Sequence, residues 1–143
     1  MEYLWLIFAL LSAFTAALVA IFGKIGLADV DANTATAIRA IIMALFLIGL
    51  IAVQGKFAEI SNIFSNHKAL LFIILSGIAG AASWLFYFIA LKGAKVWQVV
   101  PIDRLSIVFA ILMAFFLLGE KISLKAAIGA ALMVAGGIIV ALG

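Results

Sequence analysis

The sequence contains no cysteine, one proline and one histidine in 143 residues. Without cysteine there are no disulfides, no thiolate catalysis and no Cys-ligated metal. Charged residues are also scarce, at 10%, against about a quarter in an ordinary soluble domain. The basic residues are scattered singly, so no polybasic patch supports a nucleic-acid partner. The isolated carboxylates and one peripheral histidine form no catalytic constellation, so we expect neither an enzyme nor a bound metal or cofactor.

Apolar residues are abundant and fall into five long runs. Hydrophobic residues make up 69% of the chain. A stretch of about 20 apolar residues spans a bilayer core. The runs cover residues 3–22, 34–53, 69–91, 97–118 and 124–142. We therefore predict an all-α, multi-pass protein of the plasma membrane, with lipid as its solvent and 1–143 as a single five-helix domain. Glu2 is the only charged side chain before the first run, so we expect no cleavable signal peptide.

The loop charges do not favour one orientation strongly. An odd number of spans places the two termini on opposite sides of the membrane. The side of the N-terminus collects four cations, and the other side collects three, or five with Arg39 and Arg104. Positive residues in short loops orient membrane proteins, and this bias is small. Two interpretations remain: a weakly biased protein of one orientation, or dual topology with an antiparallel homodimer.

Small residues recur on one face of several spans. Such faces let helices approach closely in lipid. The first span carries Thr15 on a hydroxylated stripe, where packing and lining of a polar path are both open. The third span carries Ser76 and Gly80. The stripe of the fifth span predicts a dimer seam or repeat interface, and it comprises Ala126, Gly129, Ala130, Met133, Gly136 and Gly137.

Three charged residues lie beyond the first turn of a predicted span, namely Arg39, Asp103 and Arg104. Each costs about 2.5–3.5 kcal/mol at a helix centre on insertion scales. Arg39 and Asp103 enter from the same side at similar depth, so we expect them to pair, while Arg104 snorkels or faces water. A structural ion pair and a solute or coupling-ion site are both open. The one uncompensated positive charge favours an anionic or zwitterionic solute, and Asp103 is the deep carboxylate available to protons.

Other local patterns predict helix ends and aromatic contacts. Trp84 and Tyr87 lie too deep for an interfacial belt, so they pack against a neighbouring helix or form a solute wall. We expect Pro101 in or near the first turn of the fourth span. The predicted helix boundaries are a stop at Gly23, an N-cap at Asn33 or Thr34, and a short interfacial helix over 57–64.

Three segments carry a family resemblance. They read ALKG at 90–93, VPIDRLS at 100–106 and LGEKIS at 118–123. With the span count and the glycine-rich last span, they resemble the EamA-like branch of the drug/metabolite transporter superfamily. Many members hold ten spans as two inverted halves, whereas this chain resembles the five-span members that work as pairs.

The resemblance implies a permease or exporter of small organic solutes. It also implies a central path near Thr15, Trp84, Tyr87 and Pro101. The alternative from another class is a membrane subunit without transport of its own, or half of a heterodimer that moves lipid-linked sugars.

Overall fold

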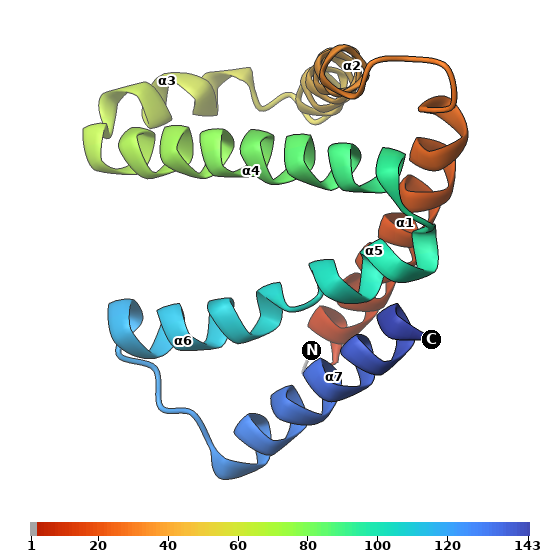
Figure 1. The fold of residues 1–143 in the computed structure, drawn as a ribbon. Helices are drawn as coiled ribbons and strands as arrows, with labels where there is room; N and C mark the ends of the chain where they lie inside the picture. Colours follow the sequence, from red (N-terminus) through yellow and green to blue (C-terminus); the bar gives the residue numbers. More distant parts are fainter. Residues whose placement is uncertain (1–2) are drawn as a thin grey trace. The chain divides into compact units, whose positions relative to one another are not determined.

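The structure, a computed structural model, describes residues 3–143 (Figure 1). All regular elements in this range are helices. They are α1 (Leu4–Gly26), α2 (Ala32–Val53), α3 (Phe57–Ser65), α4 (His67–Gly93), α5 (Val96–Asp103), α6 (Ser106–Leu118) and α7 (Leu124–Leu142). Five helical stretches are long and apolar enough to cross a membrane, with Val96–Leu118 counted as one. The prediction of an all-α, five-span membrane protein is confirmed.

Two predicted helix ends are wrong. Helix α1 continues through Gly23 to Gly26, because a glycine with negative φ can continue a helix and Gly23 is not among those with positive φ. Helix α2 is capped by Asp31 instead of Asn33 or Thr34. The Asp31 carboxylate accepts hydrogen bonds from the Thr34 amide at 2.9 Å and the Thr34 hydroxyl at 3.0 Å. These two bonds, the backbone one first, lower the pKa of Asp31 below its usual 3.8 because they stabilise the charged form.

The loops follow turn chemistry that the sequence encodes. The short helix predicted over 57–64 is present as α3, and Figure 1 shows the chain reversing between α3 and α4. Gly119 ends α6 with φ 68°, a left-handed conformation that glycine adopts without steric cost. Ser123 then caps α7 by accepting the Ala126 amide at 3.1 Å, an ordinary N-cap.

The fourth span is interrupted, and this was not expected. Pro101 is the sixth residue of α5, just past the first turn near which it was expected. Past it, the Leu105 amide donates to the Ile102 carbonyl at 3.0 Å and the Ile107 amide donates to Arg104 at 3.1 Å. These bonds reach back three residues, as in a 3₁₀ turn. The span is thus interrupted between Asp103 and Ser106, on the C-terminal side of Pro101, and we refer to this interruption as the bend.

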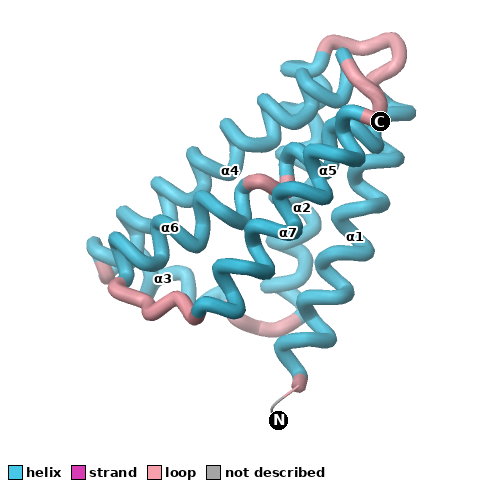
Figure 2. The backbone as a smooth tube through the Cα atoms, turned by 60° about the horizontal axis from the view of Figure 1, so that its bottom comes forward, coloured by secondary structure: helices cyan, strands magenta, loops and turns pink. Residues whose placement is uncertain are grey.

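The chain divides into two compact units. One comprises the chain up to Lys24 together with Gly93–Gly143, and the other comprises Ile25–Lys92. In the first unit α7 packs along α5 and also meets α6, an arrangement that Figure 2 shows from a second direction. In the second unit the side chains of Leu27 and Leu91 are fully buried, and the Lys92 ammonium donates to the Val30 carbonyl at 2.6 Å. Most other large apolar side chains in the described residues are exposed, as expected of a chain solvated by lipid.

Candidate functional site

The second unit holds an arginine stacked on a tryptophan. Arg39 lies about two turns after the start of α2, and its side chain is half-buried. The guanidinium carbon lies 3.6 Å from the centroid of the Trp84 ring and 5.2 Å from that of Phe88. Both rings belong to α4. A cation over an aromatic face gains about 0.5–2 kcal/mol, which offsets part of the cost of placing this charge in a span.

The rings of α4 support one another. Trp84 meets Tyr87 edge to face, with centroids 5.5 Å apart, and it meets Phe88 in the same way at 6.0 Å. Residues three and four apart share one helix face, so this face of α4 is an aromatic surface. Phe88 is buried at 4% exposure, whereas Trp84 and Tyr87 are half-buried. Phe88 therefore lies beside the indole on the side that faces Arg39, and the guanidinium packs against both rings. Phe88 was missed in the sequence, although its spacing from Trp84 signals it.

The guanidinium edge has no acidic partner within the second unit. The acids of this unit are Asp29, Asp31 and Glu59. Asp31 caps α2 and Glu59 accepts from Asn62 at 3.3 Å, and within residues 25–92 no carboxylate forms an ion pair with Arg39. Stacking occupies the flat face of the group and leaves its five N–H donors directed sideways. Asp103 belongs to the other unit, so the Arg39–Asp103 pair stays a prediction.

Two charged residues of the first unit, Asp103 and Arg104, lie where the fourth span bends. Asp103 is the last residue of α5 and is half-buried. Arg104 follows it as an exposed C-cap, and its amide donates to the Val100 carbonyl at 3.2 Å. Pro101, Asp103 and Arg104 therefore lie within a few residues of the bend, which the sequence did not signal. The snorkelling predicted for the Arg104 side chain stays a prediction.

Thr15 has its hydroxyl engaged in its own helix. The hydroxyl donates to the Leu11 carbonyl at 2.9 Å and to the Ser12 carbonyl at 3.0 Å. Such back-bonding is the usual way for a threonine to satisfy its donor within a helix. The exposed Thr15 oxygen can therefore act toward a solute only as an acceptor while these bonds hold.

The predicted packing residues divide into contacting and open positions. A Cβ added at Gly137 would lie 3.2 Å from the Pro101 carbonyl oxygen, so this glycine permits a close approach of α5 and α7. Ala130 is buried in the same helix. The other predicted positions lack such contacts within their own units: an added Cβ meets nothing within 4 Å at Gly80, Gly129 or Gly136, while Ser76 and Met133 are exposed.

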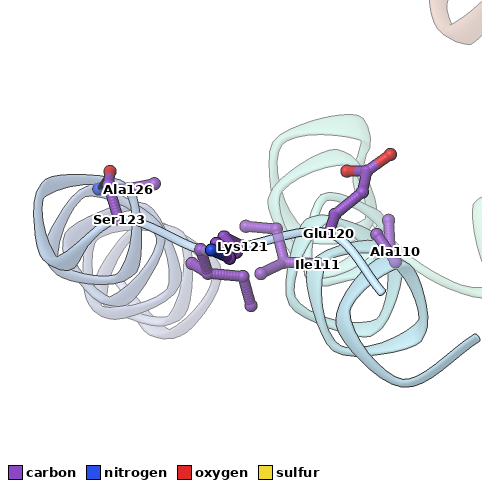
Figure 3. Close-up of a pocket in the computed structure, with 8 residues that line it drawn as sticks. Ala110, Ile111, Glu120, Lys121, Ser123 and Ala126 are labelled. Atoms are coloured by element: carbon purple, nitrogen blue, oxygen red, sulfur yellow. Dashed lines mark hydrogen bonds between the residues drawn. The ribbon is translucent and has the colours of Figure 1, made fainter. Parts of the chain in front are cut away.

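A shallow hollow lies between the end of α6 and the start of α7 (Figure 3). Its lining residues are Ala110, Ile111, Ala114, Glu120, Lys121, Ile122, Ser123 and Ala126. In Figure 3 the Glu120 carboxylate points away from Lys121, so the hollow gathers no convergent polar groups. Among residues 3–143 no group of three or more His, Asp or Glu side chains is placed to hold a metal ion.

Comparison with known proteins identifies the family. The sequence model of the EamA-like transporter family matches residues 3–142. The chain belongs to this family. It is also 39% identical over 141 residues, 99% of each chain, to a Sinorhizobium protein named "Uncharacterized transporter in cobO 3'region". No solved structure matches the chain. Together with the five apolar spans, this family identifies a multi-pass membrane transporter.

Proposed function

We propose that this EamA-like transporter carries a small organic solute across the plasma membrane by alternating access, as an antiparallel homodimer and without enzymatic activity. In this scheme two inverted five-span copies enclose a site near the bilayer midplane and rock about it. Each copy supplies one half of the solute path. Permease and exporter directions both fit the scheme.

The observation that carries the proposal is the position of Arg39. An arginine inside a membrane helix faces the bundle interior or a water-filled cavity and marks a solute or ion pathway. Here it is half-buried, stacked on Trp84 at 3.6 Å, and without an acidic partner in its own unit. Placing the Arg39 charge inside a membrane helix costs free energy, so its presence there supports a functional role over a purely structural one.

Three features support an inverted pair. The span count is odd, the loop cations are shared four to three between the two sides, and Gly129 and Gly136 leave part of the α7 face open within its unit. Small open positions suit close contact with another helix. The Sinorhizobium relative has nearly the same chain length, since the alignment covers 99% of each chain.

The absence of native cysteine makes a direct test practical. Single cysteines placed at Ser61 and at Asp29 report the two faces of the membrane. In intact cells, partial labelling of both positions by an impermeant maleimide supports dual insertion, and labelling of only one position contradicts it.

Transport itself is tested in proteoliposomes. The purified chain should accelerate counterflow of a radiolabelled solute chosen from a panel of organic acids and zwitterions. A chain that stays monomeric in nanodiscs and moves none of these solutes would contradict the proposal and favour a non-transporting subunit. Activity that appears only with a second, homologous chain would favour a heterodimer.

A further inference from the structure

We propose that Arg39, held on Trp84, binds the carboxylate of an apolar organic monoanion, and that this anion is the solute. The inference rests on the proposed transport function and specifies its substrate class. It starts from the guanidinium of α2 and the aromatic face of α4, which lie in the same unit.

The position of the Arg39 guanidinium over the Trp84 ring suits the binding of a planar oxyanion. Trp84 covers one flat face of the guanidinium at 3.6 Å, and Phe88 lies at 5.2 Å. The free edge offers pairs of parallel N–H donors that match the two oxygens of a carboxylate, and such bidentate pairs are short and strong. The stacked ring also limits rotation of the side chain, so less entropy is lost when the anion binds.

The charge balance favours a monoanion. Arg39 is the single cation of α2, and within its unit no acid pairs with it. A carboxylate cancels its charge and leaves a neutral pair inside the membrane. A phosphate group brings about −1.5 to −2 at neutral pH, so it would leave an uncompensated negative charge at high cost.

The neighbouring surface favours an apolar body for this anion. Tyr87 and Trp84 are half-buried, and the centroids of their rings lie 5.5 Å apart. Such rings provide a flat apolar surface beside the charged group. A hydrocarbon or ring attached to the carboxylate can pack there, whereas a small hydrophilic anion gains nothing from it.

Trp84 itself serves as the reporter of binding. The chain has three tryptophans, and a Trp5→Phe, Trp97→Phe variant leaves Trp84 as the one indole. In maltoside micelles, which carry no anionic headgroup, cyclohexanecarboxylate should change its emission saturably. Cyclohexanecarboxamide, of the same shape without charge, should have no effect, and inorganic phosphate should bind at least about tenfold more weakly.

Arg39 variants in this background make the test specific. Arg39→Gln should abolish the saturable change, and Arg39→Lys should weaken it about tenfold or more, because lysine keeps the charge and loses the planar fork. Lys125→Gln removes an exposed cation of α7 and should leave the affinity unchanged. An equal response to the carboxylate in Arg39→Gln, or equal binding of the carboxamide, would overturn the proposal.

Two further arms separate the alternatives. In nanodiscs, anionic lipid that changes the emission without being displaced by the carboxylate would assign Arg39 to a lipid headgroup and overturn the inference. Counterflow of neutral or cationic solutes that survives in Arg39→Gln would also overturn it and leave the transport function standing. Carboxylate binding without any transport would retain the site and reject the transport function.

Discussion

The backbone carbonyl of Pro101 lies so close to Gly137 that a Cβ on the glycine would approach its oxygen to 3.2 Å. This contact joins α5 to α7. We predict that Gly137→Val destabilises the chain by about 1–3 kcal/mol, the usual cost of overpacking. The measurement is the thermal midpoint of the monomer in detergent.

Gly136→Val provides the matched control, because an added Cβ there meets nothing within 4 Å. Both variants change helix propensity alike. If Gly136 lies at the dimer seam, its variant should weaken dimerisation and leave monomer stability nearly unchanged. Equal destabilisation of the monomer by both variants would show that the Pro101 contact is unimportant.

The stacking of Arg39 on Trp84 should be measurable as a coupling energy. A double-mutant cycle with Arg39→Met and Trp84→Leu should give a coupling of about 0.5–2 kcal/mol from thermal or denaturant unfolding. Lys95 and Trp97 form the comparison pair. The Lys95 ammonium nitrogen lies 5.6 Å from the centroid of the Trp97 ring, at the start of the fourth span. We expect a smaller coupling there, and a coupling near zero for Arg39 and Trp84 would contradict the stacked geometry.

Added loop charges should fix the orientation of the chain. Gln54→Lys with Ser61→Lys should hold the N-terminus in the cytoplasm, and Ala28→Lys with Asp29→Lys should hold it outside. If the functional unit is an antiparallel pair, each variant alone should lose transport and coexpression of the two should restore it. Full activity of either variant alone would count against the inverted pair.

Transport can be driven by the gradient of the solute or by protons, and if protons drive it, Asp103 is the acid that couples them. It is half-buried at the bend of the fourth span. Asp103→Asn should abolish uptake driven by a pH gradient in proteoliposomes while counterflow of the solute continues. Preserved concentrative uptake would rule out this role, and loss of counterflow as well would indicate damage to the solute path.

The Asp31 carboxylate that caps α2 should make the thermal stability of the chain depend on pH. The two hydrogen bonds from Thr34 lower the pKa of Asp31 below 3.8. A lowered pKa in the folded state stabilises the fold fully above the unfolded value, and this contribution disappears as the pH falls through the folded value. Between pH 6 and pH 3 the thermal midpoint should therefore fall more in the native chain than in Asp31→Asn. Asparagine retains the cap and does not titrate. Identical curves would contradict this role.

Span number and helix type follow directly from hydropathy, because a bilayer requires long apolar helices whatever their partners. The aromatic face of α4 was also predictable in part, since Trp84 and Tyr87 are three residues apart on an apolar helix. Side-chain contacts were harder. The pairing of Arg39 with Asp103 stays a prediction because the two residues belong to different units, whereas the stacking of Arg39 on Trp84 within one unit was not foreseen.

Helix ends were the least predictable feature. Gly23 reads as a stop signal, yet α1 continues through it. Asp31 is preferred to Asn33 as the cap because its carboxylate accepts both donors of Thr34. The bend at Arg104 depends on the three-residue hydrogen bonds that follow Pro101, and one proline in a sequence does not reveal where such bonds begin.

The bend divides the fourth span into α5 and α6, which differ in how extensively they pack against α7. The piece before it is anchored, since Pro101 sits against Gly137 and α5 lies along α7. Helix α6, which follows the bend, packs against α7 much less than α5 does. At its other end α6 stops at Gly119, which has a left-handed backbone conformation. Because α6 is packed against α7 much less than α5 is, a change of tilt at the bend would disturb the α5–α7 contact less if α6 moves than if α5 moves.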